Sequence, residues 1–184
     1  VAGFTTNQLG LITTTQIAAL TSVSIAGLSS SQIAAIASDS VSGIETGDLV
    51  ALTSLQLQGF TPDQVKDLTT DQVAALKSAQ VGALTTAQVN TFSSDQLTAL
   101  TTLNVKGLTA AQVVAINSSA IAGLETVDLN ALTSAQVAGF NATQLGKFSS
   151  TLIAAFTSES ISGLSSAQVQ VIATDAIQGI ETRD

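Results

Sequence analysis

Hydrophobic positions recur with a period of eight residues along the whole chain. From Phe4 to Ile180 every eighth residue is Leu, Ile or Phe, and we call this the Leu column. Five residues later, from Leu9 to Ile177, every position is Val, Ile or Leu, and Val1 belongs to this Val column too. No insertion breaks the register, so the 184 residues are twenty-three octads. Such a repeat indicates a solenoid, and the two columns are its predicted core.

The single proline of the chain indicates how each octad begins. Thr61 is followed by Pro62, Asp63 and Gln64, which is the order of residues at a helix N-terminus. Proline suits the first helical position because that amide has no partner within the helix. Thr61 as the N-cap and Gln64 at the third helical position, N3, form a capping box that bonds two free amides reciprocally. Eleven of the twenty-three octads carry this Thr/Ser-x-x-Gln signal, so we predict helix starts along the Thr/Ser column.

A period of eight does not fit one long helix. Each octad would rotate the hydrophobic stripe by about 80° around a continuous α-helix, so no side would stay apolar. If each octad is a separate capped helix of about six residues, both columns share one face because neighbours three apart lie together. We therefore predict an all-α solenoid. A β-solenoid is the alternative, although columns at odd spacings would point to opposite faces of a strand.

Glycine and alanine fill most of the positions before the Leu column. We expect these glycines to adopt the left-handed conformation that ends a helix and turns the chain. Several octads with this glycine carry Ser, Ala or Asn at N3, as Ser40 with Gly43 does, and most neighbouring glycine octads are two octads apart. The spacing predicts two helices per superhelical coil. About eleven such layers, spaced by roughly 8 to 10 Å, would give a rod on the order of 100 Å long.

Glu-Thr-x-Asp boxes replace the usual capping signal in three octads. They are Glu45 with Asp48, Glu125 with Asp128, and Glu181 with Asp184. The first two lie ten octads apart in similar segments, IETGDLVALTS and LETVDLNALTS, which indicates a longer duplication. Paired carboxylates could bind calcium, but a spacing of three matches no dedicated calcium loop. The favoured interpretation is acidic residues placed at positive helix N-termini.

The chemical composition narrows the function further. A net charge of -8 with five basic residues argues against nucleic acid and against an anionic membrane surface. No apolar run is long enough for a transmembrane helix, so we expect no membrane insertion. Without His, Cys or Tyr, the many Ser and Thr hydroxyls have only carboxylates and a few lysines as neighbouring bases. These lysines are Lys66, Lys77, Lys106 and Lys147. We predict no enzyme activity and no catalytic, cofactor or metal site, and we regard Asn117 and Asn141 as glycosylation sequons of minor weight.

The consensus Leu-Thr-Thr-x-Gln-Val-Ala-Ala-Leu resembles tandem octapeptide arrays in very large secreted or surface-attached bacterial proteins of the adhesin-like, or haemagglutinin-like, kind. The resemblance covers the whole chain and implies a stalk or filament outside the cell or on its surface. It carries over no functional residue, because the motif itself is structural, and it names no adhesion partner.

Three classes of function follow from these observations. We favour a structural spacer or filament, in which residues 1–184 form a single continuous solenoid taken from, or repeating within, a longer array. Joining Asp184 to Val1 would keep the octad register, so we also expect chains to associate end to end. Ser or Thr follows the cap in twenty of twenty-three octads, and such stacked hydroxyls could instead bind ice or carbohydrate. An idealised, designed solenoid is the third interpretation.

Overall fold

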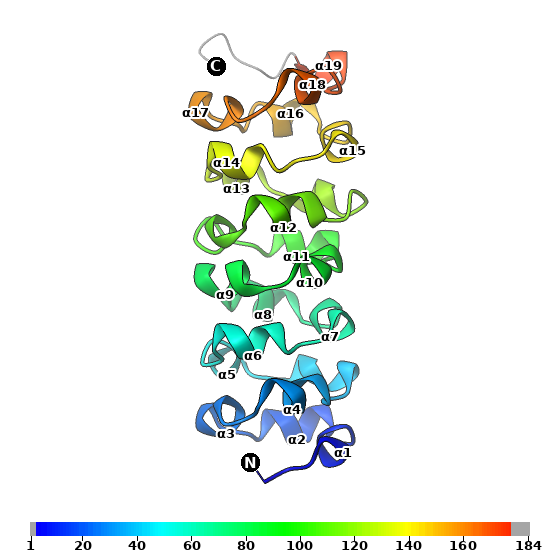
Figure 1. Cartoon of the computed structure of the whole chain (residues 1–184), viewed down its shortest axis with the longest axis vertical. Helices are drawn as coiled ribbons and strands as arrows, with labels where there is room; N and C mark the ends of the chain where they lie inside the picture. Colours follow the sequence, from blue (N-terminus) through cyan, green and yellow to red (C-terminus); the bar gives the residue numbers. More distant parts are fainter. Residues whose placement is uncertain (1–2, 178–184) are drawn as a thin grey trace.

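The computed structural model describes residues 3–177 as a rod of short helices, stacked in successive coils from the N-terminal end to the C-terminal end (Figure 1). The α-helices are α1 (Thr6–Leu9), α2 (Thr14–Ala18), α3 (Ser22–Ala26), α4 (Ser30–Ala34), α5 (Thr46–Leu49), α6 (Ser54–Gln58), α7 (Pro62–Lys66), α8 (Thr70–Ala75), α9 (Ser78–Ala83), α10 (Thr86–Asn90), α11 (Ser94–Thr98), α12 (Ala110–Ala115), α13 (Thr126–Asn130), α14 (Ser134–Val137), α15 (Ala142–Leu145), α16 (Ser150–Ile153), α17 (Ser158–Ile161), α18 (Ser166–Val169) and α19 (Thr174–Ile177). The 3-10 helices are η1 (Ser38–Gly43), η2 (Val105–Gly107) and η3 (Ile121–Gly123). No strand occurs between residues 3 and 177, which confirms the all-α solenoid over the β-solenoid.

The helices begin where the capping signal predicts. At α7, Thr61 is the N-cap and Pro62 occupies the first helical position. The Gln64 backbone N–H donates to the Thr61 hydroxyl over 3.2 Å, and the Thr61 backbone N–H donates to the Gln64 side-chain oxygen over 2.8 Å. Helices this short are unstable alone because nucleation is costly, so their packing in the rod must stabilise them.

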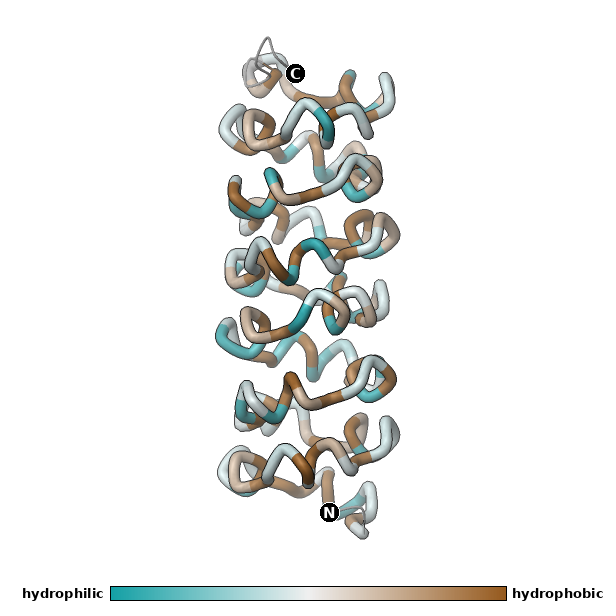
Figure 2. Tube along the Cα trace, turned by 90° about the vertical axis from the view of Figure 1, so that its left-hand side faces the viewer, coloured by the Kyte–Doolittle hydropathy of each residue, from teal (hydrophilic) through white to brown (hydrophobic). Residues whose placement is uncertain are grey.

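The two hydrophobic columns form one continuous core. Side chains of both columns are almost completely buried from Ile25 to Phe156. Figure 2 shows hydrophobic and hydrophilic segments alternating along each coil. Phe140, Phe148 and Phe156 come from three consecutive octads and still contact one another, with ring centroids 5.1 to 6.1 Å apart. The Leu-column side chains of consecutive octads therefore all point inward, toward the axis of the rod.

The prediction of two helices per coil is wrong. Helix α7 packs on η1, three octads earlier, and on α10, three octads later. The Gln64 side chain also reaches the backbone of Ile33 and Ile36, four octads earlier. A coil therefore holds between three and four octads. The described residues make roughly six coils, so a spacing of about 8 to 10 Å gives a rod of about 50 to 60 Å.

The glycines before the Leu column do not act as left-handed caps. No residue among 3–177 has a positive φ, and Gly59 ends α6 with a φ of −73°. A Cβ added to Gly59 would instead lie 2.8 Å from the Ser30 Cα, which belongs to the preceding coil. The chain uses glycine here because the coils approach each other too closely for a side chain.

Octads without glutamine at N3 often form tighter turns. Ser40, Asn104 and Ala120 occupy N3 in the octads of η1, η2 and η3. Ser24 and Ser160 occupy the same position in α3 and α17, so the loss of glutamine favours the 3-10 form without requiring it. None of the helices in the described part of the chain is long and apolar enough to cross a lipid bilayer.

Candidate functional site

The joint between successive coils is built around the N3 side chain. Gln88 is 1% exposed. Its side-chain oxygen accepts from the Thr85 backbone N–H over 2.7 Å, which completes the capping box of its own helix. Its Nε2 donates to the carbonyls of Leu57 and Phe60, over 2.9 and 2.7 Å, in the preceding coil. One side chain thus fixes its own helix start and ties two coils together.

This joint recurs along most of the rod. In each of these octads the buried N3 glutamine donates to the carbonyl 28 residues earlier, and in all but one it also donates to the carbonyl 31 residues earlier. These glutamines are Gln56, Gln64, Gln72, Gln80, Gln88, Gln96, Gln112, Gln136 and Gln144. The exception is Gln56, which bonds Ala26 instead, 30 residues earlier. Removing one amide would leave the carbonyl 28 residues earlier without its donor, at a cost of about 1 to 3 kcal/mol, whereas the carbonyl 31 residues earlier still accepts a backbone N–H of its own octad.

Asn104 shows that a shorter amide still reaches. Its Oδ1 accepts from the Thr101 backbone N–H over 2.8 Å. Its Nδ2 donates to the carbonyls of Val73 and Ala74 over 3.1 and 3.3 Å. An amide with the length of aspartate can therefore make both the cap and the joint.

Among residues 3–177, two aspartates occupy the N3 position and lack these bonds. Asp48 is 4% exposed; its Oδ1 accepts from the Ser22 hydroxyl over 2.6 Å, but its Oδ2 has no partner. Asp128 is 1% exposed, and neither of its carboxyl oxygens has a partner. Burial, and secondly the negative charge of Glu125, raise the pKa of Asp128 from 3.8 to about 6. These two residues are the acidic side chains at N3 in the described part of the rod.

The glutamates of the same boxes contribute little to the joint. Glu45 and Glu125 are the N-cap residues of α5 and α13, they are exposed, and their side chains make no capping hydrogen bond. Within residues 3–177 no group of three or more carboxylates comes together to hold a metal ion. The third predicted box, Glu181 with Asp184, lies outside the described residues.

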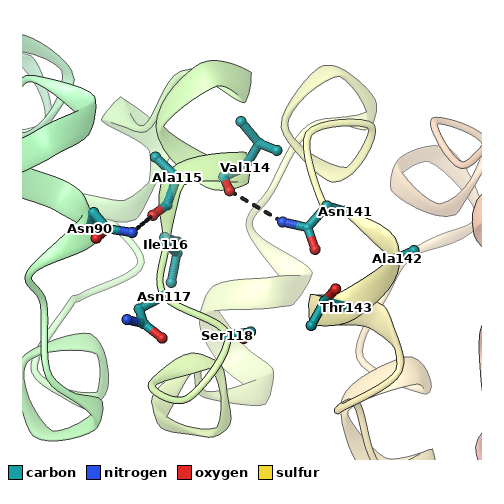
Figure 3. Close-up of a pocket in the computed structure, with 9 residues that line it drawn as sticks. All are labelled: Asn90, Val114, Ala115, Ile116, Asn117, Ser118, Asn141, Ala142 and Thr143. Carbon is teal, nitrogen blue, oxygen red and sulfur yellow. Dashed lines mark hydrogen bonds between the residues drawn. The ribbon is translucent and has the colours of Figure 1, made fainter.

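A groove with both polar and apolar side chains in its wall lies between coils. A cavity of about 510 Å³ lies between α10, α12 and α15. In Figure 3 Asn90 and Asn141 reach across it to the coil that carries α12. Asn90 donates to the Ala115 carbonyl over 2.7 Å and Asn141 to the Val114 carbonyl over 3.3 Å. Asn90 and Asn141 are thus occupied in joining the coils.

A second recess lies at the first coil. It has a volume of about 400 Å³ and is mostly apolar, with Phe4, Leu9, Leu11, Ile12 and Leu20 in its wall. Gln8 and Gln16 also line it, and their amide nitrogens make no hydrogen bond to a described residue. In later coils the equivalent amides bond the coil before, so this surface has the shape and donors of an open joint.

Comparison with known protein families identifies the repeat. A family model described as the ALTTAQ repeat matches residues 41–78, 73–102 and 121–158, which together make up more than half of the chain. The chain belongs to the ALTTAQ repeat family. Comparison with curated proteins found no match.

The six letters of the ALTTAQ repeat occur at residues 83–88, and the structure gives several of them a role. Leu84 is a core residue of the Leu column. Thr85 is the N-cap of α10, and Gln88 makes the joint to the preceding coil. The ALTTAQ motif is therefore a folding unit, and the chain is a structural repeat protein.

The other residues singled out in the sequence are scattered over the ALTTAQ repeats. Lys66, Lys106 and Lys147 are exposed, and Lys77 donates to the Val50 carbonyl over 3.1 Å. Of the two sequons, Asn117 is exposed, whereas Asn141 is the N-cap of α15. Sequence reasoning missed the joint because it assigned glutamine only to the cap. The signal was present, since a cap needs only the glutamine oxygen and leaves the amide nitrogen without a role.

Proposed function

We propose that the chain is a rigid spacer of an extracellular or cell-surface bacterial assembly, a stalk or filament segment that holds an adhesin-like part at a distance. The observation that supports this best is the uniform joint between coils. From Gln56 to Gln144 most octads bond the backbone four octads earlier in the same way. Each coil is therefore bonded to the coil before it. The bonds make the rod stiff along its length, and they are not confined to one site.

The chemistry of the rod surface supports a spacer as well. The outer groove at α12 is bridged by asparagine side chains that already have backbone partners. The net charge of -8 would keep parallel rods apart by repulsion. A spacer needs these properties, namely length, stiffness and a surface that does not adhere to itself sideways.

We propose in addition that such rods continue end to end. The open recess at the first coil presents Phe4, which is 40% exposed, and the free amides of Gln8 and Gln16. A coil of the same repeat would cover the apolar wall and offer carbonyls to both amides. The covering coil can belong to the same polypeptide or to a second copy, because both would present the same backbone.

Length is the property that tests the spacer. Chains with one, two and three copies of the 184-residue sequence in register should show a maximum dimension that rises linearly in small-angle X-ray scattering, with a constant cross-section. A dimension that grows more slowly, as for rods joined by flexible links, would contradict the proposal. Antibodies against the folded rod should bind intact source cells, and staining only of permeabilised cells would contradict the location.

Electron microscopy of the single 184-residue chain tests end-to-end contact separately. Fibres with the diameter of one solenoid are the expected result. A monodisperse monomer at high concentration would rule out association between copies and leave the spacer proposal intact.

The hydroxyl column is the second candidate function. Most Ser and Thr residues at the first helical position are exposed, for example Thr70, Thr86 and Thr126. Several others already bond a neighbouring coil, as Ser22 and Ser30 do. Inhibition of ice recrystallisation, or retention on insoluble chitin or cellulose, would favour a binding surface over a spacer. Absence of both activities is expected.

A further inference from the structure

Asp128 sits where an uncharged donor belongs. At this position of the octad, Asn104 and the glutamines donate to carbonyl groups of the preceding coil. The register that pairs Gln88 with Leu57 and Phe60 places the carbonyls of Leu97 and Leu100 opposite Asp128. No described side chain donates to either carbonyl, and neither carboxyl oxygen of Asp128 has a partner. In this register an ionised carboxylate would lie opposite two carbonyl oxygens with no donor of its own, and only the Leu97 carbonyl has another donor, the Leu100 backbone N–H.

The charges around Asp128 do not compensate the ionised form. Glu125, on the same helix, is negative and raises the pKa of Asp128 further. Helix α16, which packs on α13, carries no charged residue. In the preceding coil, Asp95 of α11 and Lys106 of η2 are both exposed. Burying a charge without a partner is costly, so the neutral carboxyl is favoured here.

A neutral carboxyl would restore the missing bond. Its O–H can donate to a carbonyl across the coil interface, as Nδ2 of Asn104 does over 3.1 Å to Val73. The other oxygen stays free to accept, which is the role that Oδ1 of Asn104 has at its own cap. The protonated Asp128 side chain thus has both the length and the hydrogen-bond donor that the joint requires. The ionised side chain has the same length but no donor.

We propose that Asp128 makes the joint between its coil and the preceding coil sensitive to pH, closed when the carboxyl is protonated and weakened when it is ionised. Asp48 occupies the same octad position ten octads earlier and differs in one respect, because the Ser22 hydroxyl donates to it. Thr102, which takes the place of Ser22 beside Asp128, makes no such bond. Among residues 3–177 one aspartate at N3 thus has a hydroxyl donor and the other has none.

The direction of the pH effect follows from the carboxyl itself. The folded-state pKa of Asp128 lies above its ordinary value, so between about pH 4 and about pH 6 the folded chain binds more protons than the unfolded chain. The stability that this joint contributes is complete below about pH 4 and is lost as the pH rises through about 6.

Two measurements on the full chain test the proposal. The Asp128 carboxyl should titrate near pH 6 by carbon-13 NMR, with its signal assigned from its absence in Asp128→Asn. Hydrogen-exchange protection of the α13 amides, corrected for intrinsic exchange, should fall on the order of 100-fold between about pH 4 and about pH 7.5. Asp128→Asn should abolish this loss, whereas Asp95→Asn, which changes an exposed aspartate, should retain it.

Three results would overturn the proposal. One is a carboxyl that titrates near its ordinary value, and another is an equal loss of protection in Asp128→Asn. The third uses millimolar CaCl₂ as the probe at about pH 7.5. If calcium restored protection in the wild-type chain and not in Asp128→Asn, the oxygen atoms would hold a cation rather than a proton.

Discussion

The octads at residues 85–92 and 125–132 have the same core and different joints. Val89 and Leu129 are fully buried at the same position of the octad, and Phe92 and Leu132 follow them in the Leu column. Gln88 ties the first octad to the preceding coil with two hydrogen bonds, whereas Asp128 makes none. Burial of apolar surface is thus common to both octads, and the hydrogen bonds of the N3 side chain to the preceding coil are what differ.

The difference separates two contributions to the stability of the rod. The hydrophobic columns favour compact coils but fix no particular offset, because aliphatic contacts are not directional. The N3 amide is directional and buried, so it defines how one coil sits on the next. An octad can therefore fold with an aspartate at N3, and the coil interface is where the substitution is felt.

The largest expected effect comes from converting the first octad into the second. Gln88→Asp should destabilise the chain by about 3 kcal/mol at neutral pH, because it buries a charge and leaves the Phe60 carbonyl without its donor, although the Leu57 carbonyl still accepts from the Phe60 backbone N–H. Urea unfolding followed by circular dichroism measures the loss. Gln58→Asp, at an exposed position of α6, is the matched control and should change stability by less than about 0.5 kcal/mol. Equal losses would mean that the joint adds nothing to the capping role.

The stability of the chain should be nearly as sensitive to the distance between coils as to the hydrogen bonds between them. Gly107→Ala places a Cβ against the Ser78 carbonyl of the preceding coil, so a loss of about 2 kcal/mol or more is expected from overpacking. Gly47→Ala is the control, because a Cβ there meets no atom within 4 Å. It should be neutral or stabilising by up to about 1 kcal/mol, since alanine favours helix. Thermal unfolding of both variants gives the comparison, and a harmless Gly107→Ala would refute the steric explanation of the glycines.

The sequence predicts the local structure of this rod well because local structure depends on neighbours in the chain. Thr61, Pro62 and Gln64 lie within one octad and specify the start of α7 by themselves. The core columns follow from the same short period. In both cases the interacting groups are side chains, whose identity is read directly from the sequence.

The glutamine donor of the joint could be found in the sequence, but its acceptors could not, because they are backbone carbonyls. Every residue has one, so nothing in the sequence marks Ile33 and Ile36 as partners of Gln64. The spacing of glycines suggested two helices per coil, but Gly59 lies against Ser30, nearly four octads earlier in the chain. Asp128 is buried by the same coil interface. Because the sequence does not reveal that interface, the Glu-Thr-x-Asp box of Asp128 predicts an ordinary acidic helix start.

A smaller loss of stability is expected when Asp48 is deprived of its hydrogen-bond donor, which would leave it without a partner, like Asp128. Ser22→Ala removes the hydroxyl that donates to Asp48 over 2.6 Å and leaves a second buried carboxylate without a partner. A loss of about 1 to 2 kcal/mol at neutral pH is expected, as for other hydrogen bonds to charged groups. Ser54→Ala is the matched control, because Ser54 holds the same octad position, is exposed and has no side-chain hydrogen bond. If both variants unfold at the same urea concentration, Ser22 does not distinguish Asp48 from Asp128.

The smallest expected effect is a gain, and it isolates the cap from the joint. Octad 77–84 has Lys77 as the N-cap of α9, with no side-chain capping bond, although Gln80 still joins its coil to Leu49 and Leu52. Lys77→Thr should supply an oxygen for the Gln80 backbone N–H and raise stability by about 0.5 to 1 kcal/mol. The gain is reduced by loss of the exposed Lys77 bond to the Val50 carbonyl. Lys66→Thr, at the C-terminal end of α7, removes the same charge without adding a cap and should give no gain. A rise in the urea midpoint for Lys77→Thr alone would show that cap and joint contribute separately, whereas equal shifts would assign the effect to charge.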